Sequence, residues 1–215
     1  MAVGFKPMAK DFRLDERALS KGELTDASLV ANRAFFNDPF FHFLSPGERL
    51  RARSLTIFFR ANLAHFGEGG RIVTVREPDN TIVGVAAWLP TGRYPQSVRT
   101  QLVQIPGTFR ALYRRPRALI DGHKYLTAVA KSHPKEPHWY LYLLVADPSI
   151  QRSGAGTMLM HHGLALADAE GVGAYLETQN EDNLAYYRRF GYELSATLRP
   201  VKDGPPLYTM WRRPR

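Results

Sequence analysis

The pattern of apolar and polar positions along the 215-residue chain predicts an α/β fold. Short apolar runs rich in β-branched and aromatic residues are typical of strands. They cover residues 12–14, 71–76, 81–89, 141–146, 172–178, 192–196 and 207–211. Apolar residues at helical spacing predict helices over residues 24–36, 45–65, 154–170 and 184–190. Because strands and helices alternate, we expect one domain, residues 1–215, with a mixed sheet flanked by helices.

Polar and proline residues predict where some of these helices begin. Thr25 or Ser28 is placed to cap the first helix, and Ser45 is placed to cap the second, with Pro46 at its first position. Residues 93–133 are expected to form a mostly helical excursion that prolines interrupt.

The stretch Leu141–Gly156 organises the rest of the chain. An apolar run with the length of a buried strand ends at Pro148, because proline cannot continue a central strand. The next helix then opens with Gly154 and Gly156, which let the backbone approach a ligand closely. The free N–H groups and the dipole of a helix start attract anions, phosphates above all. The stretch therefore predicts a strand leading into a phosphate-binding helix start, to which Arg152 adds a positive charge.

Composition excludes several other chemistries. The chain has no Cys, so it contains no disulfide, thiol nucleophile or thiolate metal site. It has no apolar run of about 18 residues and no apolar signal core, so we expect a cytoplasmic protein with no membrane partner. Adjacent helix residues point about 100° apart, so His161 and His162 do not readily share a metal ion, and we expect no metal site.

The net charge of +9 is unevenly distributed. The segment from residue 93 to 124 has one acidic residue, Asp121, against the following basic ones: Arg93, Arg99, Arg110, Arg114, Arg115, Arg117 and Lys124. This segment is either a solvated face or a surface that attracts an anionic cofactor or partner. The chain shows no zinc-binding pattern, aromatic RNA-binding signature or helix-turn-helix spacing, so nucleic acid is not an expected partner.

Two blocks of residues resemble the GNAT superfamily of N-acetyltransferases. The first is Gln151-x-x-Gly154-x-Gly156 after an apolar strand, which is similar to the pyrophosphate-binding signature of that superfamily. The second is Asn183–Tyr192, which is similar to its asparagine, tyrosine and glycine-aromatic block. Within the superfamily, Asn37–Phe41 and Leu176–Thr178 resemble puromycin N-acetyltransferase-type members.

The resemblance implies a mostly antiparallel sheet whose central strands splay apart, and it implies acetyl-CoA as cofactor. The glycine turn would then bind the pyrophosphate, and the end of the preceding strand would bind the pantetheine arm through main-chain groups. A main-chain N–H near Val145 or Ala146 is also placed to stabilise the oxyanion. The expected cofactor-binding residues are Leu144, Val145, Ala146, Gln151, Arg152, Ser153, Gly154, Ala155, Gly156, Thr157, Asn183 and Tyr186.

The same resemblance assigns catalytic roles. Tyr187 takes the position of the general acid that protonates the leaving thiolate, with Tyr186 as a competitor on chain position. Glu177, near the carboxyl end of its strand, is the leading candidate for the base that deprotonates the amine. His42 and His138 are weaker candidates, and a chain of water molecules is an alternative to any single base.

The acceptor is expected to be a small-molecule amine. Phe40 and Phe41 lie in a short connector and form either core or the wall of a substrate pocket. Trp88 is likewise either core or pocket wall. The expected substrate-binding residues are Phe40, Phe41, Trp88 and Tyr142. A protein or peptide amine, and a non-catalytic acyl-CoA-binding module, remain alternatives. The resemblance also leaves a homodimer open.

Overall fold

The computed structural model describes residues 11–66, 69–95 and 115–215. Its strands are β1 Arg13–Glu16, β2 Arg71–Arg76, β3 Ile82–Leu89, β4 His138–Ala146, β5 Gly173–Thr178, β6 Glu193–Leu198 and β7 Leu207–Arg212. Its helices are α1 Lys21–Phe35, α2 Pro39–Leu44, α3 Glu48–Phe66, α5 Pro116–Ser132, η1 Pro148–Ile150, α6 Ala155–Ala169 and α7 Asp182–Arg188. The strands and helices predicted within the described residues are therefore present, with ends shifted by a few residues. Most of the basic segment, residues 96–114, lies outside the described residues.

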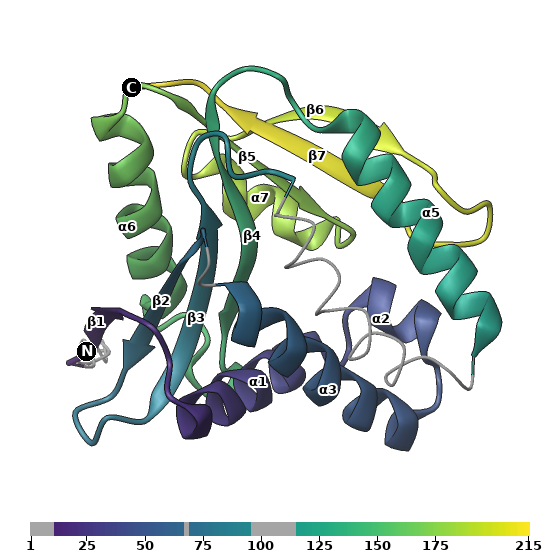
Figure 1. Ribbon diagram of the computed structural model, residues 1–215, viewed down its shortest axis with the longest axis horizontal. Helices are drawn as coiled ribbons and strands as arrows, with labels where there is room; N and C mark the ends of the chain where they lie inside the picture. The colour runs from purple at the N-terminus through teal and green to yellow at the C-terminus, as the bar shows by residue number, and fades with distance from the viewer. Residues whose placement is uncertain (1–10, 67–68, 96–114) are drawn as a thin grey trace, which may run out of the picture.

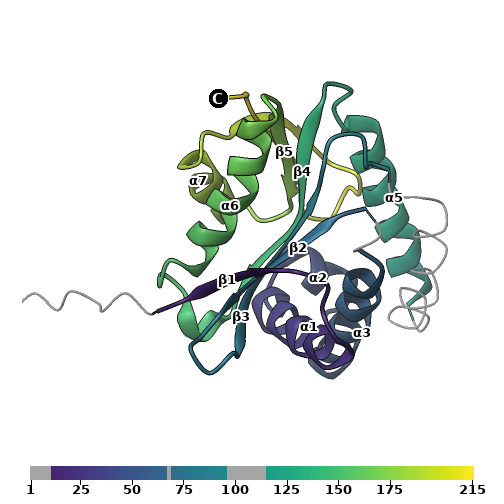
Figure 2. The same cartoon turned by 60° about the vertical axis from the view of Figure 1, so that its left-hand side comes forward.

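All strands belong to one seven-stranded sheet in the order β1-β2-β3-β4-β5-β7-β6. Only β4 and β5 pair in parallel, and the other neighbours are antiparallel. Helices α1, α2, α3 and α5 lie on one face of the sheet, and α6 and α7 lie on the other (Figures 1 and 2). The expected mixed, mostly antiparallel α/β fold is confirmed.

Each face of the sheet has its own apolar core. One core joins α6 and α7 to the sheet through buried residues such as Leu159, Leu164 and Leu184. The other joins α1 and α3 to the opposite face through residues such as Val30 and Phe59. Because both faces are covered, every residue of β3 is buried.

Two helix starts differ from the sequence prediction. Helix α1 begins earlier, because Ser20 caps it and forms a reciprocal capping box with Glu23. Thr25 and Ser28 lie inside the helix, where each hydroxyl bonds a carbonyl of the preceding turn. Ser45 ends α2 instead of capping α3, and its hydroxyl has no hydrogen-bond partner. No helix in the described ranges combines the length and apolar content that crossing a bilayer requires.

Candidate active site

The central strands β4 and β5 separate partway along their length. Their pairing runs from His138 opposite Gly173 to Leu141 opposite Leu176, whereas β4 itself continues to Ala146. The β3–β4 register shifts where Ala87 lies opposite Leu143 and Trp88 opposite Leu141, so β4 has an extra residue, Tyr142, at this point. A bulge of this kind bends a strand and increases its twist. The splayed central strands expected from the resemblance are therefore present.

The free edge of β4 presents main-chain donors to the opening. The Asp147 N–H donates to the Val83 carbonyl on the β3 side, at 2.8 Å. Successive N–H groups of a strand point to opposite sides. The N–H groups of Ala146 and Leu144 therefore point toward the gap that β5 leaves, where an extended ligand can pair with them.

The glycine turn lies directly after this edge. Arg152 and Gly154 both adopt left-handed backbone conformations, with φ of 63° and 98°. The first hydrogen bond of α6 runs from the Met158 N–H to the Gly154 carbonyl, at 3.0 Å. The N–H groups of residues 155–157 therefore precede the helical bonding pattern and are available to an anion. A Cβ built on Gly154 would meet nothing within 4 Å, so the turn is open to a ligand.

A cleft of about 620 Å³ runs along the β4 edge and the glycine turn. Eleven of the twelve expected cofactor-binding residues line it: Leu144, Val145, Ala146, Gln151, Arg152, Gly154, Ala155, Gly156, Thr157, Asn183 and Tyr186. Ser153 is not among its lining residues. Arg152 and Arg189 supply positive charge, and the guanidinium of Arg189 lies 4.8 Å from the centre of the Tyr186 ring. Both the shape and the charge of the cleft fit a long polyphosphate ligand such as coenzyme A.

A second pocket, of about 190 Å³, adjoins this cleft on the α1–α3 side of β4. Its lining is rich in aromatic residues: Phe35, Phe40, Phe41, Phe58, Phe59, Tyr140, Tyr142 and Tyr187. Its only charged lining residues in the described ranges are Asp38 and Glu177, both acidic. The Tyr142 hydroxyl donates to Asn62 Oδ1 at 2.8 Å, which fixes its ring in the wall. The pocket therefore suits a cation with an apolar body.

Tyr187 lies where the two cavities meet, because it lines both of them. The same is true of Phe35, Asp38, Leu144 and Asn183. Burial raises the pKa of Tyr187, and the neighbouring Tyr186 and Asp38 raise it further. The phenol therefore keeps its proton at neutral pH and is available to donate it.

The neighbouring Tyr186 lines only the cofactor cleft. A Cβ on Gly156 would lie 2.9 Å from its hydroxyl oxygen, so the ring packs against the glycine turn. Burial raises the pKa of Tyr186 to about 12. Asn183 fixes the start of α7, since its Nδ2 donates to Thr178 Oγ1 at the end of β5, at 3.1 Å.

Three residues named from the sequence lie away from this aromatic pocket. Trp88 is completely buried on the α6 side of the sheet, where its ring fills the space above Gly163, so it is core and not pocket wall. His42 is exposed on α2 and lines neither cavity. His138 lines a separate cleft at the start of β4.

The structure also brings in residues that sequence reasoning did not select. Asp38 caps α2, with its Oδ1 accepting from the N–H groups of Phe40 and Phe41 at 3.0 and 3.4 Å. Burial raises the pKa of Asp38. Its position before Pro39 was a signal for a helix cap, but nothing in the sequence indicated that it joins two cavities. His133 is the other such residue, and it contacts Glu177 from behind the acceptor pocket.

Comparisons with known proteins agree with this geometry. The family model for the acetyltransferase (GNAT) family matches residues 33–192. The chain is similar to a structure of histone acetyltransferase HPA2 and related acetyltransferase from Corynebacterium glutamicum, with 25% identity, TM-score 0.69, and coverage of 94% of this chain and 97% of that one.

Two structures of lower identity share the fold. PaiA N-acetyltransferase from Thermoplasma acidophilum, in complex with coenzyme A, has 12% identity and TM-score 0.56 over 94% of this chain and 99% of its own. Arylalkylamine N-acetyltransferase 2 from Aedes aegypti has 11% identity and TM-score 0.55 over 94% of this chain and 100% of its own. The chain belongs to the acetyltransferase (GNAT) family and is an acetyl-CoA-dependent N-acetyltransferase.

Proposed function

We propose that the acceptor of this N-acetyltransferase is a small-molecule primary amine with an apolar or aromatic body and no carboxylate beside the amine. The observation that carries this proposal is the aromatic pocket beside Tyr187, whose charged lining residues in the described ranges are Asp38 and Glu177. A protonated amine is attracted to these carboxylates, and the rings cover its apolar part. A carboxylate on the same molecule would be repelled.

Coenzyme A is held by groups that the fold already presents. The N–H groups of residues 155–157 and the side chains of Arg152 and Arg189 bind its phosphates. The N–H groups of Leu144 and Ala146 bind the extended pantetheine arm and its thioester. Bound acetyl-CoA supplies an acyl group activated as a thioester. An arm bound along the β4 edge would end near Tyr187, which lines both cavities.

Two side chains of the pocket carry out the proton transfers. Glu177 takes a proton from the bound ammonium group, which leaves a neutral amine able to attack. The Tyr187 phenol donates its proton to the departing sulfur, and the second proton that the attacking nitrogen loses returns the phenolate to the phenol. Of the N–H groups of Leu144 and Ala146, which face the same opening, the one beside the thioester is placed to stabilise the oxyanion, and the other pairs with the pantetheine arm. Two adjoining cavities that share one wall support direct attack with both substrates bound.

The resemblance to puromycin N-acetyltransferase-type enzymes supports an amine that carries a ring. The residues of that resemblance include Phe40 and Phe41, and both rings are half-buried in the pocket wall. A protein amine is the second candidate, because the relative from Corynebacterium glutamicum is described as a histone acetyltransferase and related acetyltransferase.

An acceptor screen tests the proposal. Release of the coenzyme A thiol would be measured with 2-phenylethylamine, with phenylalanine, which adds a carboxylate, and with a lysine-containing peptide. We expect the highest kcat/KM for 2-phenylethylamine and at least about a tenfold loss for phenylalanine, since a carboxylate placed near Glu177 costs on the order of 1 kcal/mol or more. A preference for the peptide would contradict the proposal and support the second candidate.

A further inference from the structure

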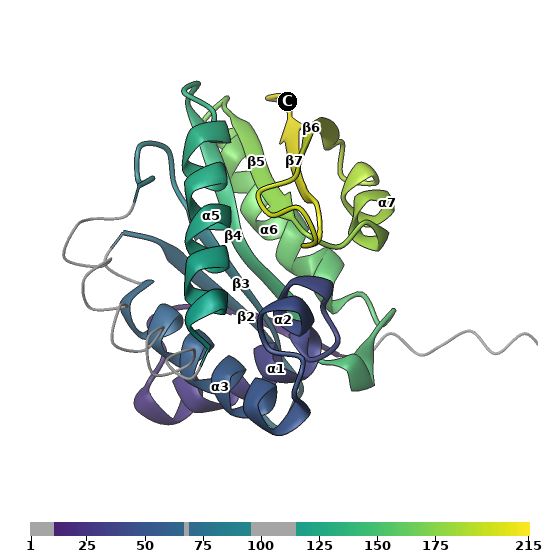
Figure 3. The same cartoon turned by 90° about the vertical axis from the view of Figure 1, so that its right-hand side faces the viewer.

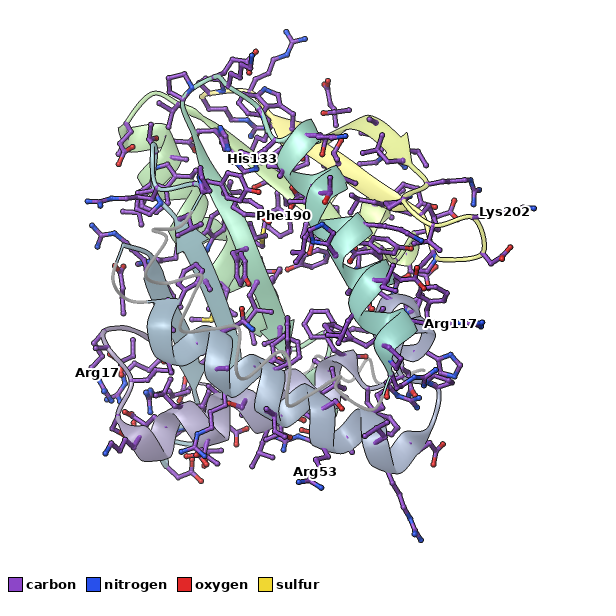
Figure 4. All side chains as sticks on the ribbon, turned by 45° about the vertical axis from the view of Figure 1, so that its right-hand side comes forward. Arg17, Arg53, Arg117, His133, Phe190 and Lys202 are labelled. Carbon is purple, nitrogen blue, oxygen red and sulfur yellow. The ribbon has the colours of Figure 1, made fainter. Side chains whose placement is uncertain are left out.

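Glu177 has a partner on the side away from the acceptor. Its side chain is 5% exposed, and its Oε1 has no hydrogen-bond partner. Nδ1 of His133, whose side chain is 7% exposed, lies 3.9 Å from Oε1. This distance is too long for a hydrogen bond and short enough to become one after a small rotation. His133 follows the last residue of α5, the helix drawn nearly vertically in Figure 3, and Figure 4 labels it near the end of that helix.

The contacts of His133 and His138 determine which ring nitrogens carry protons. Nδ1 of His138 lies 2.6 Å from the Glu136 carbonyl oxygen, which only accepts, so Nδ1 bears hydrogen. In neutral His138, Nε2 is then an acceptor. Nε2 of His133 lies 3.0 Å from Nε2 of His138, so Nε2 of His133 must carry the hydrogen that is donated between them. Nδ1 of neutral His133, which faces Glu177, is therefore unprotonated and able to accept a proton.

The histidine pair leads away from the acceptor pocket to a different opening. His133 and His138 both line a cleft of about 220 Å³ that Thr91, Lys135 and Glu136 also line. Glu177 lines the acceptor pocket and is absent from this cleft. The two histidines therefore connect the buried carboxylate with a second surface cleft. The described residues contain no group of three His, Cys, Asp or Glu able to hold a metal ion.

Aromatic rings enclose the connection. Tyr94 stacks on His133 with ring centroids 3.5 Å apart, and the edges of Tyr140 and Tyr175 contact the same imidazole at 5.0 Å. Burial raises the pKa of Tyr140 and Tyr175, and the negative charge of Glu177 adds to both shifts. Burial lowers the pKa of His138, which favours its neutral form as a proton acceptor. The titratable and charged groups around the pair are Tyr94, Lys135, Glu136, Tyr140, Tyr175 and Glu177.

We propose that His133 and His138 form a proton relay that returns Glu177 to its ionised state in each catalytic cycle. The inference rests on the proposed function, in which Glu177 is the base. Glu177 takes a proton from the ammonium group and passes it to Nδ1 of His133. The Nε2 proton of His133 moves to Nε2 of His138, and the pair releases one proton to water in the second cleft. Before the next cycle His133 regains its starting tautomer by exchanging protons with water in that cleft, which it lines. No bond other than N–H and O–H bonds forms or breaks, and no further reactant is needed.

The physical need for such a route comes from the position of Glu177. While acceptor and cofactor fill the front cavities, the carboxyl group is closed off from solvent on that side. On the other side its titratable neighbours are His133 and the phenols of Tyr140 and Tyr175, and because the pKa of both phenols is raised, the imidazole is the group able to accept its proton.

The test uses His133→Ala and two small molecules of similar shape. Imidazole fills the vacated space and carries protons, whereas pyrazole fills it and is far less basic. Turnover of 2-phenylethylamine, which binds as a cation, is compared with that of phenylacetohydrazide, which is neutral at the same pH. The matched control is His161→Ala, which removes an exposed histidine on α6 that packs against Phe190.

We expect His133→Ala to lower kcat for 2-phenylethylamine about tenfold to a hundredfold with little change in KM, at the lower end of what proton transfer contributes. Imidazole should raise the kcat of His133→Ala for 2-phenylethylamine several-fold, and pyrazole should not. The kcat for the hydrazide should be nearly the same in His133→Ala as in the wild-type enzyme. Equal rescue by both azoles, or an equal loss with both acceptors, would assign His133 a packing role and overturn the relay. Turnover of neither acceptor by the wild-type enzyme would instead refute the proposed acceptor class.

Discussion

A Cβ placed on Gly156 would lie 2.9 Å from the hydroxyl oxygen of Tyr186, so this tyrosine occupies the space that a side chain would need at the start of α6. The contact couples the glycine turn to α7. Gly156→Ala should therefore push the Tyr186 ring aside and narrow the cofactor cleft. We expect the Kd for coenzyme A, measured by calorimetry, to rise about tenfold, which corresponds to about 1.4 kcal/mol. Gly122→Ala is the control, because a Cβ there meets nothing within 4 Å; an unchanged Kd in Gly156→Ala would show that the ring yields freely.

Tyr187→Phe should separate chemistry from cofactor binding. Loss of the phenol proton removes the donor to the leaving sulfur, so kcat should fall by about 10²–10⁴-fold, the usual contribution of a general acid. The Kd for coenzyme A should stay within about twofold, because the ring remains at the junction of the two cavities. Tyr192→Phe is the matched control, since that hydroxyl is buried in the core without a partner. Full activity of Tyr187→Phe would remove this residue from the mechanism.

Asp38→Asn should test the charge of the acceptor pocket without disturbing helix α2. The Oδ1 atom that accepts from Phe40 and Phe41 is kept in asparagine, so the cap survives. Removing the negative charge should raise KM for a cationic amine about tenfold, since a carboxylate near a bound cation contributes on the order of 1 kcal/mol. The KM for the neutral hydrazide should stay unchanged. An equal rise for both acceptors would indicate damage to the pocket instead of lost electrostatic attraction.

Gly163→Ala should destabilise the fold. A Cβ at this position would lie 2.1 Å from the indole of Trp88, which is completely buried and has no room to move. Overpacking of this kind costs about 1–3 kcal/mol, and the better helix propensity of alanine offsets up to about 1 kcal/mol. Urea unfolding should show a lower midpoint at an unchanged slope. Gly122→Ala, an unobstructed glycine in α5, should instead gain about 0.5–1 kcal/mol.

Stability should decrease at alkaline pH. Burial raises the pKa of Tyr187, Tyr192 and Tyr175 above the usual value, and it raises the pKa of Tyr142 to about 12. Above about pH 10 the unfolded chain loses these protons while the folded chain keeps them. The unfolded state then binds fewer protons, so the free energy of unfolding falls as pH rises through this window. Urea titrations at a series of pH values from neutral to alkaline measure how steeply the free energy of unfolding falls with pH, and Tyr192→Phe should make this fall shallower. An unchanged slope in that variant would contradict the assignment of Tyr192.

The sequence determined the features that depend on near neighbours. Apolar runs placed the strands, and Gly154 and Gly156 marked an anion-binding helix start, because backbone freedom and free N–H groups are local properties. Resemblance to the GNAT superfamily added the cofactor, which the family match confirms. The choice of Tyr187 as acid remains a prediction, although its place at the junction of two cavities supports it.

Tertiary structure decided what depends on distant segments. Both faces of β3 are buried, so its hydrophobic pattern gave no sign of which face Trp88 occupies. The gap between β4 and β5 opens beyond Leu141, where pairing with a strand far along the chain stops. Only the packing of α5 against the sheet brings His133 to Glu177, and only the turn before α2 carries Asp38 between the two cavities. Such pairings follow from the closure of long loops around a common core, which no local pattern of residues encodes.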